Sequence, residues 1–223
     1  MDDERLAAAG WESVRRPTGG RALLHTDELT YSIAGLESTP DLAGGVLLSY
    51  RQISRGLEAG LTHLGLLPDP PAPAITGEVD RLNPVCFEVP SAYEITVGGK
   101  KLIGSAQLRR RGSVLQHGSL PLSGDLTRVV RGLRYPDEQA RRQAAERLLQ
   151  HATTVEQLLG RVVSFDEAAA ALVAGFSEAL GWSFSRGELT QVERSATARF
   201  EAALDRQAGT PRPPAVAALG GHR

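Results

Sequence analysis

The chain has 223 residues, of which 41% are hydrophobic and 23% charged, and 25 basic against 26 acidic side chains give a formal charge of -1. These values are typical of one large globular domain, or of one domain with an appendage. The near-neutral charge argues against a main role in binding nucleic acid or an anionic membrane. The sequence shows neither a signal-peptide pattern nor a membrane-length apolar run, so we expect a cytoplasmic protein. The single cysteine, Cys86, excludes an intrachain disulfide and a cysteine-rich zinc site.

The first part of the chain mixes short extended runs with glycine turns. Strand-like residues occupy 13–16 and 29–33, and the pair Gly19-Gly20 breaks the chain between them. Apolar residues then recur at spacings of three and four, which predicts a helix over about 46–65 with its apolar face in the core. The prolines within 68–73 predict a stiff extended connector.

The segment 93–120 predicts three neighbouring antiparallel strands. Residues 93–97 alternate in polarity, and Gly98-Gly99 is typical of a two-residue hairpin turn that leads into a second arm running toward Gln107. Residues 113–120 read as the third strand. We interpret the run Arg109–Arg111 as a solvated strand edge, or as a basic patch that steers an acidic carrier protein.

From Pro136 onward the hydrophobic period is helical. Pro136 suits a first helical position, and the segments 153–156 and 164–167 have the spacing of capping boxes. An apolar stripe predicts the buried face of a further helix, with the members Phe165, Ala169, Leu172, Phe176 and Leu180. These features predict a small helical appendage, followed after about Gln207 by a disordered tail.

Three features of the sequence can carry chemistry. The turn at 15–22 places glycine N–H groups beside arginines, so it can hold a carbonyl oxygen, a carboxylate or a phosphate, or it is a surface turn. From the residues alone, His25 and His117 are better explained as half-buried structural histidines than as functional ones. Cys86 is by default a buried inert thiol. As a nucleophile it needs a neighbouring cation, which Lys101 provides if the hairpin folds back.

Taken together, three strings resemble the octanoyltransferase branch of the biotin/lipoate protein ligase family. They are residues 14–25 with 27–32, Cys86-Phe87 with 90–94, and residues 99–107 with 115–119. Segments within 159–190 are similar to the family's C-terminal helices, so the likeness extends from about residue 5 to about residue 206. Family members begin with a further strand–helix–strand portion. We therefore expect a shortened N-terminus, explained by a late start, a split gene or an inactive paralogue, with an exposed sheet edge as its consequence.

The elements and the resemblance together predict an α+β fold, a mixed and mostly antiparallel sheet flanked by helices with a small helical C-terminal subdomain. We expect a shortened acyltransferase catalytic domain over 1–130, the helical subdomain over 131–207 and the disordered tail over 208–223.

The resemblance also implies a reaction. An octanoyl group would pass from acyl carrier protein, through a cysteine thioester, to a lysine of lipoyl domains such as glycine cleavage H protein or 2-oxo acid dehydrogenase acyltransferase subunits. Cys86 would be the nucleophile and Lys101 the cation that lowers its pKa. No metal, nucleotide or other cofactor is implied. The implied substrate-binding residues are Arg16, Thr18, Gly19, Gly20, Arg21, Ala22, His25, Gly104, Ser105, Ala106, His117 and Gly118.

Three alternatives stay open from the sequence. An amidotransferase that moves octanoyl or lipoyl groups between lipoyl domains would use a cysteine too. An ATP-dependent lipoate-protein ligase needs no acyl-cysteine, so Cys86 disfavours it. A non-catalytic module that binds lipoyl domains or acyl carrier protein, or half of a two-chain enzyme, would show no turnover by the purified chain alone.

Overall fold

The computed structural model describes residues 1–71 and 94–208, with side chains up to 202. Two predictions lie outside the described residues: the nucleophile Cys86, and the disorder of the tail beyond Ala208. The chain forms two compact units, Met1–Ser183 and Phe184–Arg223, so the helices that follow the sheet up to residue 183 belong to the same unit as the sheet. The predicted domain boundaries stay predictions.

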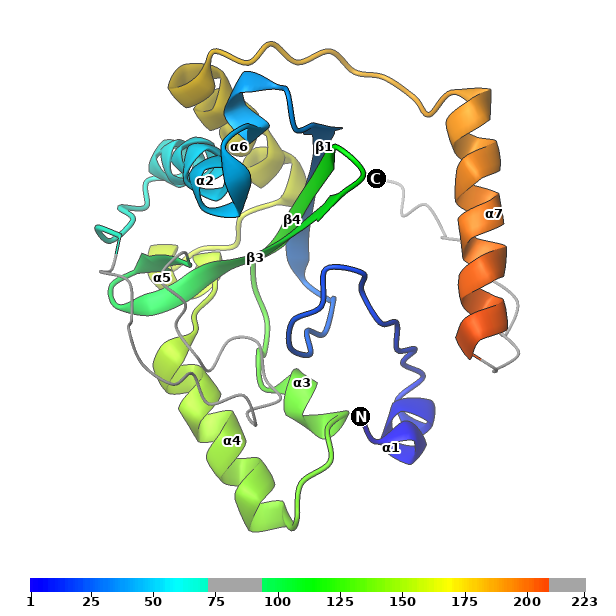
Figure 1. Cartoon of the computed structure of the whole chain (residues 1–223). Coiled ribbons are helices and arrows are strands. Elements are labelled where there is room, and N and C mark those ends of the chain that lie inside the picture. Colours follow the sequence, from blue (N-terminus) through cyan, green and yellow to red (C-terminus); the bar gives the residue numbers. More distant parts are fainter. Residues whose placement is uncertain (72–93, 209–223) are drawn as a thin grey trace, which may run out of the picture. The chain divides into compact units, whose positions relative to one another are not determined.

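An antiparallel sheet organises the larger unit (Figure 1). Its strands are β1 (Glu28–Leu36), β2 (Ile95–Val97), β3 (Lys100–Arg110) and β4 (Ser113–Pro121), in the spatial order β1-β4-β3-β2. The three predicted neighbours β2, β3 and β4 are confirmed, and Gly98 and Gly99 turn the hairpin with φ of 60° and 75°. The described pairings between strands are all antiparallel, and an isolated parallel bridge joins Lys101 to Ala152.

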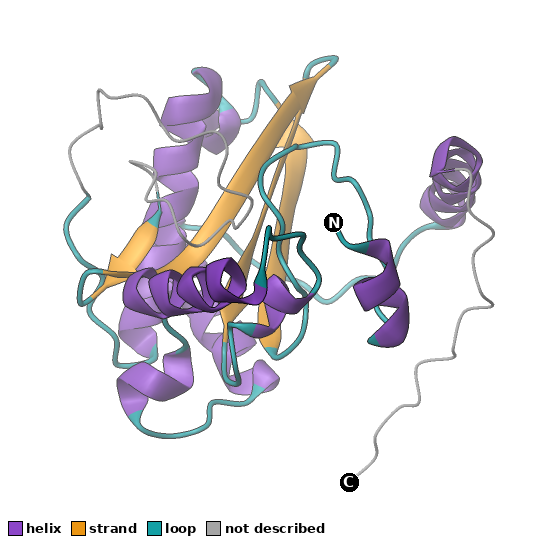
Figure 2. Ribbon diagram, turned by 90° about the horizontal axis from the view of Figure 1, so that it is seen from below, coloured by secondary structure: helices purple, strands orange, loops and turns teal. Residues whose placement is uncertain are grey.

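Helices pack against this sheet, and an irregular loop lies on its other side (Figure 2). Helices α2 (Gly45–His63) and α6 (Phe165–Leu180) share one hydrophobic core with the sheet. The other helices of this unit are shorter than α2 and α6. They are α1 (Asp3–Ala8), the 3-10 helix η1 (Pro40–Leu42), α3 (Arg128–Arg131), α4 (Glu138–His151) and α5 (Val155–Leu159). The α+β prediction and the helix predicted over 46–65 are confirmed.

Glycines bring α2 and α6 into close contact. A Cβ atom added at Gly175 of α6 would lie 2.1 Å from the backbone nitrogen of Gly60 and 2.6 Å from the carbonyl oxygen of Gly56, both on α2. Real Cβ atoms do not approach backbone so closely, so the crossing requires glycine. The predicted stripe of α6 is therefore partly wrong. Phe165 is 55% exposed, because the helix turns its small-residue edge toward α2, burying Ala168, Ala171, Leu172, Gly175 and Phe176.

Two of the predicted helix starts are displaced by one or two residues. Helix α4 begins after Asp137, whose carboxylate accepts a 2.7 Å hydrogen bond from the backbone of Ala140, so Pro136 precedes the cap instead of opening the helix. Thr154, one residue later than predicted, caps α5. The predicted cap of α6 is confirmed, since the Ser164 hydroxyl accepts from the backbone N–H of Glu167.

Arg109 begins a chain of hydrogen bonds beneath the sheet. Its Nη2 donates to the Ser49 hydroxyl over 2.8 Å and its Nε to Oε1 of Gln107 over 3.0 Å. Nε2 of Gln107 donates to Oε1 of Gln116 over 2.9 Å, and Nε2 of Gln116 donates to the Tyr31 hydroxyl over 3.1 Å. The prediction of a solvated edge is wrong for Arg109, whose side chain is 16% exposed, whereas Arg110 and Arg111 are exposed.

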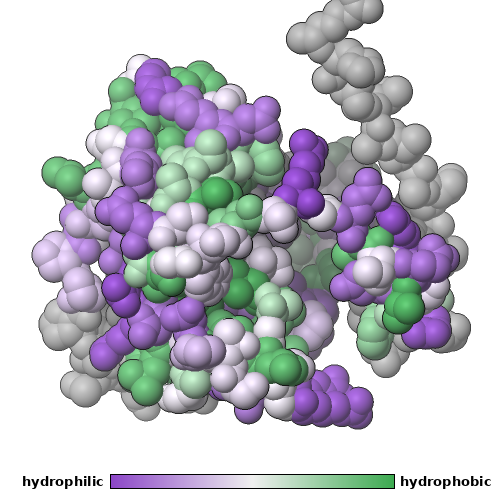
Figure 3. All heavy atoms as spheres, turned by 90° about the horizontal axis from the view of Figure 1, so that it is seen from above, coloured by the Kyte–Doolittle hydropathy of each residue, from purple (hydrophilic) through white to green (hydrophobic). Residues whose placement is uncertain are grey.

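The second unit contains helix α7 (Gln191–Ala208). Thr190 and Glu193 form a reciprocal cap at its start: the Thr190 hydroxyl accepts from the backbone of Glu193, and the Glu193 carboxylate accepts from the backbone of Thr190. Within the described ranges no helix is both long and apolar enough to cross a membrane. Figure 3 shows hydrophobic side chains interspersed with hydrophilic ones on the face seen from above.

Candidate active site

A cleft of about 640 Å³ opens beside the sheet. Two cross-strand rows run across β1, β4 and β3 beneath it, Thr30–Ser119–Gly104 and Ser32–His117–Ala106. Five of these six residues line the cleft, and the sixth, Ser119, is buried. Adjacent residues of a strand point to opposite faces, so these rows face away from the buried amides of Gln107 and Gln116. The sheet thus separates the cleft on one face from the α2 core on the other.

The loop before β1 forms the wall of the cleft. Thr18 reaches across to the sheet, where its hydroxyl lies 2.9 Å from Nε2 of His117. Within the loop, Nη2 of Arg16 donates to the carbonyl of Arg21 over 2.8 Å, and the backbone of Gly19 donates to the carbonyl of Arg16 over 3.0 Å. Gly19 and Gly20 have φ of 69° and 93°, a left-handed conformation that favours glycine.

Residues 13–16, predicted as a strand, belong to this irregular loop. The prediction is wrong because strand-like residue types form a strand only with a ladder partner, and Pro17, which has no N–H, interrupts any such ladder. The loop satisfies part of its backbone through the Arg16 side chain instead.

A carboxylate anchors the far end of the loop. Glu28, at the start of β1, contacts Nδ1 of His25 with one oxygen and accepts a 2.5 Å hydrogen bond from the Ser119 hydroxyl with the other. The Glu28 side chain is 7% exposed and that of His25 is 57% exposed. The negative charge of Glu28 offsets part of the positive charge that Arg16 brings to the same cleft.

His117 is held in its neutral form at neutral pH. Partial burial lowers the pKa of its imidazole, and the positive charges of Arg16 and His25 lower that pKa further. A neutral ring at the floor of the cleft can both donate and accept a hydrogen bond, depending on its tautomer.

Acidification should destabilise the folded chain partly through His117. Its pKa in the folded state lies below the 6.5 of the unfolded chain, so the contribution to folding is complete above about pH 6.5 and is lost as the pH falls through the folded pKa. We expect the free energy of unfolding, measured by urea titration between about pH 5.5 and 7.5, to fall less steeply for His117→Gln than for the wild type. Parallel curves for the two proteins would contradict this assignment.

The two neighbouring lysines of the hairpin serve different parts of the structure. Lys101 is 3% exposed and forms an ion pair with Glu94, which is 10% exposed. Nζ of Lys100 donates to the carbonyl of Leu149 on α4 over 2.8 Å. The described residues that line the cleft do not include Lys101.

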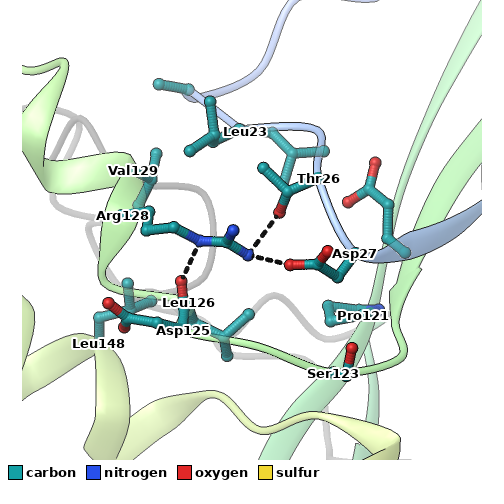
Figure 4. A pocket seen from close by; sticks show the side chains of 13 residues that line it. Leu23, Thr26, Asp27, Pro121, Ser123, Asp125, Leu126, Arg128, Val129 and Leu148 are labelled. Carbon is teal, nitrogen blue, oxygen red and sulfur yellow. Dashed lines mark hydrogen bonds and ion pairs between the residues drawn. The ribbon is translucent and has the colours of Figure 1, made fainter. Parts of the chain in front are cut away.

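A second, smaller cavity of about 30 Å³ adjoins the cleft and shares three of its lining residues, Leu23, Thr26 and Glu28 (Figure 4). Arg128 crosses it and donates to the Thr26 hydroxyl over 3.0 Å, to the Asp27 carboxylate and, through Nε, to the carbonyl of Asp125 over 3.0 Å. These bonds fix the end of the loop to the segment that follows β4.

The structure brings most of the predicted substrate-binding residues together. Eight line the cleft: Arg16, Gly20, His25, Gly104, Ser105, Ala106, His117 and Gly118. Thr18 bonds to one of these, Gly19 and Arg21 shape the loop through their backbones, and Ala22 lines the smaller cavity. Their roles in binding stay predictions.

Sequence reasoning missed several residues of β1 that line the cleft: Glu28, Thr30, Tyr31 and Ser32. The alternation of polar and apolar residues in this strand contained the signal, because Glu28, Thr30 and Ser32 share the face that carries His117.

The model of the lipoyl protein ligase A/B catalytic domain matches residues 1–177 of this sequence. The chain belongs to this family. It is 45% identical over 197 residues to octanoyltransferase LipM of Kyrpidia tusciae, covering 87% of this chain and 72% of the relative. It is 44% identical over 200 residues to octanoyltransferase LipM of Symbiobacterium thermophilum, covering 86% of this chain and 71% of that protein.

Solved structures agree with this membership. A bi-partite lipoate protein ligase from Thermoplasma acidophilum, studied with its E2 lipoyl domain, matches with a TM-score of 0.72 and 26% identity over 96% of this chain and 77% of that one. Lipoate-protein ligase A bound with ATP matches with a TM-score of 0.71 and 25% identity over 95% and 74% of the two chains. The family predicted from the three strings is confirmed.

Proposed function

We propose that this chain is an octanoyltransferase of protein lipoylation, which takes octanoyl groups from octanoyl-acyl carrier protein and transfers them to a lysine of lipoyl domains. The acceptors would be domains such as glycine cleavage H protein or 2-oxo acid dehydrogenase acyltransferase subunits. The observation that supports this most directly is the identity of 44% or more to two octanoyltransferases over most of the chain.

The geometry of the cleft fits an acyl group. Thr18 joins the arginine–glycine loop to His117 on the sheet, so a bound chain would lie between the loop and strands β3 and β4. The backbone of Gly104 and Ala106 would approach the acyl carbonyl, and Gly118 lets Tyr31 and Ser105 pack closely against β4 beneath the cleft.

The proposed chemistry has two half-reactions. In the first, the Cys86 thiolate attacks the thioester carbonyl of octanoyl-acyl carrier protein, a new C–S bond forms and the carrier thiolate leaves. In the second, the lysine amine of a lipoyl domain attacks the octanoyl thioester, a C–N bond forms and the Cys86 thiolate leaves. Lys101, a buried cation, would stabilise that thiolate.

The test is to trap the intermediate. Incubation with octanoyl-acyl carrier protein should add one octanoyl mass to the intact chain, labile to hydroxylamine, and Cys86→Ser should abolish this adduct. Cys86→Ala should abolish octanoyl transfer to a lipoyl domain. Transfer at the wild-type rate by Cys86→Ala would refute the thioester mechanism, and transfer that then depends on ATP and free octanoate would assign a ligase instead.

The pKa of the Cys86 thiol should depend on Lys101 and not on Lys100. Replacing Lys101 by alanine removes a buried cation and should raise the pKa of the thiol, measured by the pH dependence of its alkylation, toward about 8.5. Lys100→Ala is the matched control, because the Lys100 side chain is bonded to the carbonyl of Leu149. Equal shifts in the two variants would contradict the assignment of Lys101.

A further inference from the structure

Glu28 and Ser119 hold the His25 imidazole at the edge of the cleft. The Glu28 carboxylate is almost fully buried, and the Ser119 hydroxyl fixes one of its oxygens while the other contacts Nδ1 of His25. Ser119 is itself 1% exposed. A rigid, buried acceptor thus orients a ring that is open to solvent and lines the cleft.

This arrangement selects one tautomer of His25. A carboxylate can only accept, so Nδ1 carries the proton, and Nε2 keeps its lone pair in the neutral ring. A carboxylate–imidazole pair of this kind makes Nε2 the basic atom. His117 is used differently, because its Nε2 already lies 2.9 Å from the Thr18 hydroxyl.

We propose that Nε2 of His25 is the base that accepts the proton of the attacking lysine amine, and that Glu28 is the positioning residue that holds His25 in the required tautomer. The proposal rests on the function proposed above. The neutral amine attacks the thioester carbonyl, the C–N bond forms, the C–S bond breaks with its electron pair on sulfur, and the surplus proton of the nitrogen passes to Nε2. Solvent then takes that proton from the exposed ring.

The two half-reactions differ in their need for such a base. Exchange of one thiolate for another across a thioester moves no proton, whereas attack by an amine must release one. We therefore expect His25 and Glu28 to matter for transfer to the lipoyl domain and much less for loading of the chain. A residue that only supported the fold of the cleft would affect both.

Other charged groups lie near this base. Arg16 and His117 face the same cleft, and the ion pair of Asp27 with Arg128 lies in the adjoining cavity. Glu28→Gln removes the carboxylate that contacts Nδ1 of His25 and leaves these other charged groups in place.

The experiment measures the two half-reactions separately in the full chain. Loading is followed by intact mass with octanoyl-acyl carrier protein, and transfer by single turnover of the loaded chain with a lipoyl domain. His25→Asn should slow transfer about 100-fold and loading less than about twofold.

In Glu28→Gln the amide N–H₂ can donate to Nδ1, which places the proton on Nε2, so transfer should fall by a similar factor. His63→Gln is the matched control. His63 on α2 also contacts a carboxylate, since its Nε2 lies 2.8 Å from Glu178 on α6, but neither residue lines the cleft.

A ¹⁵N spectrum of the histidine rings gives a readout that needs no substrate. In the wild type His25 should show the Nδ1–H tautomer, and in Glu28→Gln the Nε2–H tautomer. Equal slowing of loading and transfer by His25→Asn, or an unchanged tautomer and transfer rate in Glu28→Gln, would overturn the proposal. Failure of the wild type to load any octanoyl group would refute the proposed function. The transfer of a lysine proton to His25 would then be refuted as well. The tautomer change in Glu28→Gln would still identify Glu28 as the positioning residue.

Discussion

Replacing Gly175 by leucine should strongly destabilise the larger unit. The Cβ position at Gly175 is 2.1 Å from the backbone of Gly60, and the backbone cannot yield as a flexible side chain does. Overfilling a packed interface costs about 1–3 kcal/mol. We expect Gly175→Ala to fall within that range and Gly175→Leu to lie at its upper end or beyond, as a lower urea midpoint.

Gly187→Ala is the control for Gly175→Ala. A Cβ atom at Gly187 would meet no atom within 4 Å, so the same exchange should leave the urea midpoint of the larger unit unchanged. A normal midpoint for Gly175→Leu would show that α2 and α6 can separate freely, and would contradict the close crossing.

Lys101→Met should cost about 3–5 kcal/mol of folding free energy. The substitution keeps the length of the side chain but removes the cation that pairs with the Glu94 carboxylate, which is 10% exposed. A buried carboxylate that loses its cation is destabilising because it has already lost most of its hydration. Urea unfolding monitored by circular dichroism measures the loss.

The double variant Lys101→Met with Glu94→Leu should recover much of that stability, because replacing both partners of a buried pair by apolar groups is often neutral. Lys100→Met should change the free energy of unfolding by less than about 1 kcal/mol, since one exposed hydrogen bond to the Leu149 carbonyl is lost. A double variant as unstable as Lys101→Met alone would show that the ion pair is not the cause.

The sequence predicted elements whose determinants are local. The hairpin of β2 and β3 followed from two adjacent glycines between alternating segments, and the helix α2 from the spacing of its apolar residues. The cap at Ser164 was local as well.

Features that depend on distant contacts were not predictable in the same way. The buried face of α6 is set by glycines of α2 that lie more than a hundred residues earlier in the chain. A hydropathy pattern does not show whether a glycine lies on the buried or the exposed face of a helix. The burial of Arg109 depends on carbonyls and a hydroxyl near the start of α2. In the candidate site, the resemblance provided the loop, Gly104 to Ala106 and His117, but the carboxylate of Glu28 emerged only when β1 and β4 were paired.

The chain of hydrogen bonds that begins at Arg109 has a single direction. An arginine can only donate, so Gln107 must present its oxygen to Arg109 and its amide nitrogen to Gln116, which in turn must donate to Tyr31. Burial raises the pKa of the Tyr31 phenol, which therefore keeps its proton and directs it at the Ser105 hydroxyl, 2.6 Å away.

These positions therefore constrain one another in evolution. Replacement of any one member leaves a buried donor or acceptor without its hydrogen bond, which costs about 1–3 kcal/mol of folding free energy. A joint replacement that removes two facing partners is tolerated. We expect natural variation at Gln107, Gln116 and Tyr31 to occur in compensated pairs. The charge of Arg109 on β3 thus restricts which residues evolution can accept on β1, two strands away.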